Sequence, residues 1–190
     1  MILFINACVR EQSRTKHLAD YLLTKLDGAV EEVRLTDIEF PVVNNSFLEK
    51  RNHLIEDEAF NDPMFALARQ FARAEQIVIA APYWDLSFPA SLKQYFEQIN
   101  VLGITFIYTP EGFPKALCNA KKLYYVTTAG GSLIPEEYGF GYVKSLASNF
   151  YGIPEILQFQ ATGLDITGAD VEDILRRARE SISQIMDATV

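Results

Sequence analysis

Hydroxyl and guanidinium side chains gather in one short segment near the amino terminus, where they could bind an anion. Residues 7–15 read ACVREQSRT and include Arg10, Ser13, Arg14 and Thr15. The segment follows an apolar run and precedes a helical pattern. Its N–H groups would therefore lie at the start of a helix, where the helix dipole favours a phosphate. An equally good interpretation is that Ser13 or Thr15 simply caps that helix.

Aromatic side chains crowd a second segment. Residues 83–88 read YWDLSF and hold the single tryptophan of the chain. They follow the β-branched run 77–81, which predicts a strand buried on both faces. A flat, conjugated ligand could lie on such a loop, with backbone amides near residues 84–86 bonded to its polar edge; core packing is the alternative. The candidate contacts are Pro82, Tyr83, Trp84, Asp85 and Leu86.

Two glycines mark a third segment. The strand-like run 122–128 (KLYYVTT) is followed by AGGS, and glycine allows a ligand to approach the backbone closely. Two glycines after a strand are otherwise an ordinary turn. The candidate contacts here are Thr128, Ala129, Gly130 and Gly131.

The elements that must position these segments are alternating strands and helices, which predict an α/β domain with a doubly wound parallel sheet. We expect one domain, 1–190, with strands at 2–7, 30–35, 77–81, 122–128 and 156–161. The first helix is expected to carry Leu18, Leu22, Lys25 and Leu26 and to end at Gly28. Further helices are expected at 64–74, 89–101 and 142–150, and from Val171 to Met186 with Ile185 on its apolar face. A further β-like run covers 104–108, and residues 36–62 are expected to form a long polar connection.

In a parallel sheet the loops after the first, third and fourth of these strands share one edge. A phosphate site, an aromatic face and backbone donors would then converge there. Together they describe a site for FMN, in which the cofactor supplies the redox chemistry.

Composition excludes several other classes of function. The net charge of −8 disfavours general binding to nucleic acid or anionic membranes, and no apolar run approaches the ~20 residues that span a bilayer. Cys8 and Cys118 do not form a disulfide framework, so a cytoplasmic location is expected. His17 and His53 lack companions at metal-ligand spacing, so no metal is expected.

Five segments of the chain resemble the flavodoxin-like NAD(P)H:quinone oxidoreductases and FMN-dependent azoreductases. They are REQSRTKHL at 10–18, APYWDLSFPASLK at 81–93, GITFIYT at 103–109, TTAGGS at 127–132 and FYGI at 150–153. The resemblance implies a five-stranded sheet in the order 2-1-3-4-5, with helices on both faces. It also implies a homodimer that reduces quinones, azo compounds or similar flat aromatic acceptors by ping-pong hydride transfer from NADH or NADPH.

The same resemblance assigns roles within the candidate site. FMN is favoured over FAD by the short chain, and the lack of a basic cluster favours NADH. Residues 13–15 would hold the phosphate, residues 83–86 would flank the ring, and Thr128, Gly130 and Gly131 would line its other edge. Phe106 or Tyr108 would shape the partner's pocket. Relatives carry a tyrosine and a histidine beyond the glycine turn; here only Tyr138 stands in that region, so no catalytic side chain is assigned.

Two other functions compete with this one. The spacing of Cys8, Arg14 and Thr15 matches the loop of low-molecular-weight tyrosine phosphatases, in which a cysteine attacks phosphate. The Asp-Pro general acid expected late in such a chain is missing, Glu11 would repel a phosphate, and Cys8 is more simply a buried, inert thiol. A flavodoxin-like electron carrier fits the acidic charge, but its T-x-T-G-x-T loop is absent.

Overall fold

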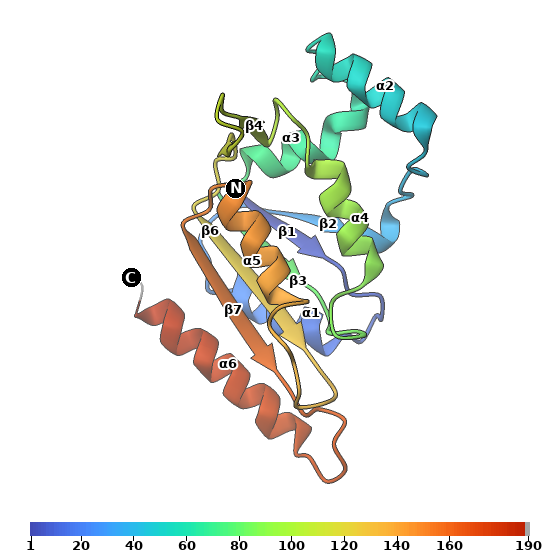
Figure 1. The fold of residues 1–190 in the computed structure, drawn as a ribbon. Helices are drawn as coiled ribbons and strands as arrows, with labels where there is room; N and C mark the ends of the chain where they lie inside the picture. The colour runs from blue at the N-terminus through green and yellow to red at the C-terminus, as the bar shows by residue number, and fades with distance from the viewer. Residues whose placement is uncertain (189–190) are drawn as a thin grey trace.

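Five parallel strands form the central sheet of the computed structural model, which describes residues 1–188 (Figure 1). The strands are β1 (Ile2–Asn6), β2 (Val30–Arg34), β3 (Gln76–Ala80), β6 (Lys122–Thr128) and β7 (Glu155–Ala161). Their order is β2-β1-β3-β6-β7, and each neighbouring pair is parallel. The expected doubly wound order, 2-1-3-4-5 when only these five strands are counted, is confirmed.

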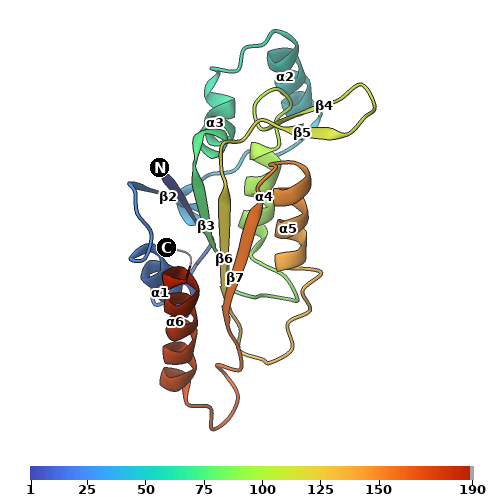
Figure 2. The same cartoon turned by 90° about the vertical axis from the view of Figure 1, so that its left-hand side faces the viewer.

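Helices cover both faces of this sheet (Figure 2). One face carries α1 (Arg14–Leu23) and α6 (Val171–Asp187), and the other carries α3 (Ala66–Arg73), α4 (Ala90–Ile99) and α5 (Phe140–Asn149). Successive residues of β3 alternate between the two resulting cores. Ile77 and Ile79 pack on the α3–α5 side, and Val78 and Ala80 pack on the α1–α6 side. The continuous apolar run is therefore what a strand covered on both faces requires.

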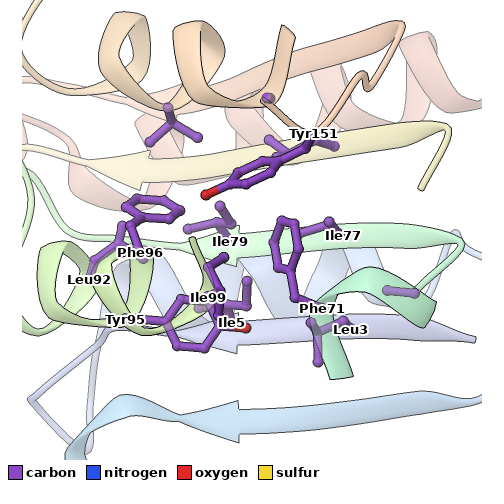
Figure 3. Packing of buried hydrophobic residues seen from close by; sticks show 14 of the residues in the cluster. Leu3, Ile5, Phe71, Ile77, Ile79, Leu92, Tyr95, Phe96, Ile99 and Tyr151 are labelled. Atoms are coloured by element: carbon purple, nitrogen blue, oxygen red, sulfur yellow. The ribbon is translucent and has the colours of Figure 1, made fainter. Parts of the chain in front are cut away.

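The α3–α5 side holds the larger aromatic core (Figure 3). The ring of Phe71 from α3 lies against that of Tyr151, with ring centroids 4.6 Å apart. The apolar positions of α4 are fully buried, as their helical spacing predicts. They are Leu92, Tyr95, Phe96 and Ile99.

The long polar connection contains a helix that the sequence pattern does not reveal. A 3₁₀ turn covers Leu35–Asp37, and α2 covers Asn45–Glu56. None of the residues of α2 is buried, so no apolar stripe distinguishes it from a loop. Its one local signal is Asn44, whose side-chain oxygen caps the helix by accepting the N–H of Phe47.

Other boundaries also differ from the expectations. The β-like run 104–108 contributes only β4 (Phe106–Tyr108), which pairs antiparallel with β5 (Pro114–Ala116) outside the main sheet. Gly28 does not end α1, which stops at Leu23; with φ of +130°, Gly28 instead shapes the turn into β2. Ile185 is 38% exposed and does not share the buried face of α6. Within residues 1–188, no helix is long and apolar enough to cross a membrane.

Candidate functional site

A cavity of about 410 Å³ lies where the strands end at their carboxyl edge. The three loops singled out above converge on it. The lining includes ten of the thirteen candidate residues: Arg10, Ser13, Arg14, Thr15, Pro82, Tyr83, Trp84, Thr128, Ala129 and Gly130. The three that do not line it are Asp85, Leu86 and Gly131.

The first turn of α1 forms one end of the cavity. Ser13 caps the helix, because its hydroxyl accepts the N–H of Lys16 at 3.3 Å, so the capping interpretation is correct. The N–H groups of Arg14 and Thr15 have no hydrogen-bond partner among residues 1–188. They remain available to an anion at the positive end of the helix dipole. Capping and anion binding are therefore compatible here.

A buried pair of hydroxyls joins the first loop to the third. The side-chain oxygens of Thr15 and Thr128 lie 2.6 Å apart, and the two residues are 1% and 8% exposed. One hydroxyl donates to the other, which fixes the start of α1 against the end of β6.

The loop after β7 supplies lining residues that the sequence analysis missed. Asp165 accepts a hydrogen bond from Arg14, with 2.8 Å between Nη1 and Oδ1. The backbone of the loop is fastened to the glycine turn, since Asp165 N–H donates to Gly130 and Gly163 N–H donates to Gly131. Leu164, Val9 and Gln12 complete the missed residues. The strand-edge argument could have reached this loop, because β7 is parallel to its neighbours and ends at the same edge.

The aromatic segment forms a tight hairpin. Trp84 and Ser87 exchange backbone hydrogen bonds of 3.1 and 2.7 Å around Asp85 and Leu86, whose φ angles are +50° and +69°. These angles suit a type I′ turn. The expectation that the Trp84 amide is free for a ligand is wrong, because it is donated to Ser87. The amides of Asp85 and Leu86 have no partner within residues 1–188.

Three aromatic residues with candidate roles lie away from this cavity. Tyr138 is 60% exposed and does not line it. Phe106 is buried against Phe150, with ring centroids 4.8 Å apart, and Tyr108 is exposed. Both belong to the β4–β5 hairpin, which stands at the opposite end of the sheet (Figure 1). They do not shape the cavity of their own chain.

Cys8 is packed in the core, where its surroundings disfavour the thiolate form. It is 5% exposed, and its thiol donates to the carbonyl of Ala80 at 3.8 Å. Burial raises the pKa of Cys8 to about 11, so the thiolate that a phosphatase needs is scarce at neutral pH. Arg14, the second residue of that motif, is paired with Asp165.

Comparison with known proteins agrees with this geometry. A family model described as the flavodoxin-like fold matches residues 1–186. The FMN-dependent NADH:quinone oxidoreductase of Lachnoclostridium phytofermentans is 35% identical over 188 residues, which cover 94% of each chain. The protein of the same name from Coprothermobacter proteolyticus is 33% identical and covers 92% of this chain and 91% of its own. The azoreductase structure from Bacillus anthracis superimposes with a TM-score of 0.83 at 26% identity, covering 98% of each chain.

Proposed function

This chain belongs to the family with the flavodoxin-like fold, and from that premise we propose that it is an FMN-dependent NADH:quinone oxidoreductase that also accepts azo compounds. The name of the relatives that match almost the whole chain supports this function. The observation that carries it is that the first turn of α1, the aromatic hairpin and the glycine turn converge on one cavity. Its volume of about 410 Å³ lies within the range of small-molecule sites, ~300–1,000 Å³.

The start of α1 would hold the phosphate of FMN. The unpaired amides of Arg14 and Thr15 supply fixed donors, and the hydroxyls of Ser13 and Thr15 are beside them. Arg10 and Arg14 add positive charge, although the charge of Arg14 is shared with Asp165. Fixed backbone donors thus carry most of the recognition in this proposal.

The hairpin and the glycine turn would hold the ring system. Trp84 is 40% exposed at the cavity, which leaves its indole free to lie beside a flat ligand. The amides of Asp85 and Leu86 are unpaired, but these two residues lie outside the cavity lining, so they would meet the polar edge of the ring only where it extends past Trp84. When bound, FMN supplies the hydride-transfer chemistry. The chain itself supplies binding, orientation and exclusion of water.

We also propose that the enzyme works as a cytoplasmic homodimer in which the β4–β5 hairpin of one chain reaches the cavity of the other. Tyr108 and Phe113 support this proposal, because these large rings on the hairpin are 54% and 69% exposed. Exposed aromatic residues at one place on a surface often mark an interface. Analytical ultracentrifugation of the wild-type chain and of Phe113→Ser tests it, and a wild-type monomer would refute it.

A redox assay tests the activity. The purified protein should be yellow, should bleach when NADH is added without oxygen, and should regain colour with a quinone. Flavin that binds but is reduced very slowly by NADH would indicate an electron carrier instead. Colourless protein that hydrolyses an aryl phosphate, and loses that activity in Cys8→Ser, would refute the proposal.

A double substitution tests the phosphate site. In Ser13→Ala/Thr15→Ala the dissociation constant of FMN should rise at least about tenfold, because each hydrogen bond to a charged group is worth roughly 1.5–3 kcal/mol. The matched control is Thr24→Ala, at the other end of the same helix, where the hydroxyl donates to the Tyr21 carbonyl. An unchanged dissociation constant in the double variant would show that the hydroxyls of Ser13 and Thr15 take no part in binding the phosphate.

A further inference from the structure

The side chain of Asn6 fastens the first loop of the site to the sheet. Asn6 is the last residue of β1 and is 1% exposed, so its polar amide needs partners inside the protein. Its side-chain oxygen accepts the N–H of Cys8 at 2.9 Å, and its side-chain nitrogen donates to Oε1 of Glu32 at 2.8 Å. These two partners fix the orientation of the amide, because an N–H group can face only its oxygen and a carboxylate only its nitrogen.

Glu32 is placed for this hydrogen bond by the register of the sheet. It lies on β2 opposite Phe4, and Asn6 is two residues further along β1, so their side chains point to the same face. That face carries α1, whose first turn forms one end of the cavity. β2 is an edge strand, and Glu32 is exposed on it. A surface carboxylate thus orients a buried amide at the base of the site.

The loop that begins after Asn6 has few other attachments. The N–H of Ala7 donates to the carbonyl of Ala80 at 2.9 Å, and the thiol of Cys8 donates to the same carbonyl at 3.8 Å. The N–H groups of residues 9–12 donate to nothing within residues 1–188, and part of this stretch lines the cavity. Successive free N–H groups in a loop can form a concave site for an anion. Their position depends on where the loop leaves the sheet, which is where Asn6 holds it.

We propose that Asn6 is a positioning residue for the phosphate of FMN and that Glu32 orients it. Asn6 does not line the cavity, so it acts through the Cys8 N–H and the loop that follows rather than by touching the ligand. An apolar side chain in its place would leave the buried Cys8 N–H without its acceptor, and the loop would have to move to satisfy that group. This inference rests on the proposed function, because the phosphate that the loop would hold is that of FMN.

Titrations with FMN and with riboflavin test the role of Asn6. Riboflavin has the same ring and ribityl chain without the phosphate, so displacement of the loop should affect FMN alone. In the near-isosteric variant Asn6→Leu the dissociation constant of FMN should rise about tenfold, because the buried hydrogen bond to the loop is lost. The dissociation constant of riboflavin should stay within about twofold of the wild-type value, since no bond to the ring is removed. Both constants rising by the same factor would mean a merely structural role and would overturn the proposal.

A pair of variants at the exposed Glu32 keeps the test available if Asn6→Leu does not fold. Glu32→Ala and Glu32→Gln remove the same negative charge, but only glutamine keeps an oxygen that can accept the Asn6 amide. The dissociation constant of FMN should be about threefold higher in Glu32→Ala than in Glu32→Gln, because only the alanine variant frees the Asn6 side chain to rotate. That of riboflavin should be the same in both. Equal FMN affinities in the two variants would overturn the proposal.

The wild-type chain distinguishes failure of this inference from failure of the proposed function. A wild-type chain that binds FMN no more tightly than riboflavin would refute the phosphate site itself, and the role of Asn6 with it. A wild-type chain that prefers FMN, together with an Asn6→Leu variant that keeps the same preference, would refute the role of Asn6 alone. Urea unfolding of each variant shows that the titrations compare folded proteins.

Discussion

The substitution Gly130→Ala should disturb the candidate site, because the added methyl group would clash with Asp165. A Cβ atom at this position would lie 2.3 Å from Oδ2 of Asp165 and 2.9 Å from its Cγ. Asp165 cannot move aside freely, because its N–H donates to the carbonyl of Gly130 and its carboxylate accepts from Arg14. Either the Asp165 carboxylate must leave Arg14, or the loop after β7 or the glycine turn must shift.

The size of the effect follows from the contacts that are lost. Overpacking typically costs about 1–3 kcal/mol. The ion pair between Arg14 and Asp165 is largely exposed, so its loss adds only about 0.2–1 kcal/mol. Together these are about 1.2–4 kcal/mol, so for a chain of this length Gly130→Ala should lower the melting temperature by roughly 2–16 °C. It should also weaken FMN binding, because both displaced segments line the cavity.

The neighbouring glycine provides the control. A Cβ atom at Gly131 would meet nothing within 4 Å, so Gly131→Ala should change stability by no more than about 0.5 kcal/mol. Asp165→Ala removes the atoms that clash, so the double variant Gly130→Ala/Asp165→Ala should cost less than the sum of its single changes. Urea unfolding and FMN titration of the wild type and the four variants measure this coupling. Equal costs at Gly130 and Gly131, or strict additivity in the double variant, would refute the reasoning.

Three further predictions follow from charge, burial and backbone conformation. Asp165→Asn removes the negative charge that is paired with Arg14 beside the proposed phosphate site, so FMN should bind more tightly at low salt. Repulsion of about 0.7–1.4 kcal/mol, ordinary for nearby charges in a largely aqueous dielectric, corresponds to about three- to tenfold in the dissociation constant. A titration that finds no change would exclude competition for Arg14. Cys8 has its pKa raised from 9 to about 11, so the fold binds the thiol proton more tightly than the unfolded chain does. The contribution of Cys8 to the free energy of unfolding is complete below pH 9 and is lost as the pH rises toward 11, by about 1.4 kcal/mol per pH unit. Urea unfolding from pH 8 to 10.5 should therefore show that stability falls less steeply with pH in Cys8→Ala than in the wild type. Leu86 has a left-handed backbone conformation that costs a non-glycine residue about 1 kcal/mol, and its side chain is 51% exposed. Leu86→Gly should therefore raise the melting temperature by about 2–4 °C. A lower melting temperature would mean that the Leu86 side chain packs on the protein.

The parts of the fold that the sequence predicts are those with buried faces. The strand at Ile77–Ile79 and the helix bearing Tyr95 are recognisable because every residue that contacts the core is apolar and correctly spaced. The helix α2 is missed because it buries none of its residues, so its sequence resembles a loop. The hairpin is also difficult to predict, since a type I′ turn usually carries Asn-Gly or a similar pair rather than Asp85-Leu86.

The candidate site also has a part that the sequence predicts and a part that it does not. Three of its loops are predictable because parallel strands end at a common edge, a rule that needs no knowledge of side-chain partners. The pairing of Arg14 with Asp165 cannot be predicted from the sequence, because an exposed carboxylate 151 residues away leaves no local pattern. Pairs of this kind decide how an arginine acts, and only the folded geometry reveals them.

The ion pair changes which groups can recognise the phosphate. A guanidinium that already bonds to a carboxylate must exchange that partner, or share its charge, before it can bind a second anion. The amides of Arg14 and Thr15 face no such competition, because no carbonyl within residues 1–188 accepts them. Their direction is set by α1, which is held by the Ser13 cap and by the hydrogen bond between the hydroxyls of Thr15 and Thr128. In the proposed site the helix start is therefore the constant part of phosphate recognition, and the arginine charge is the adjustable part.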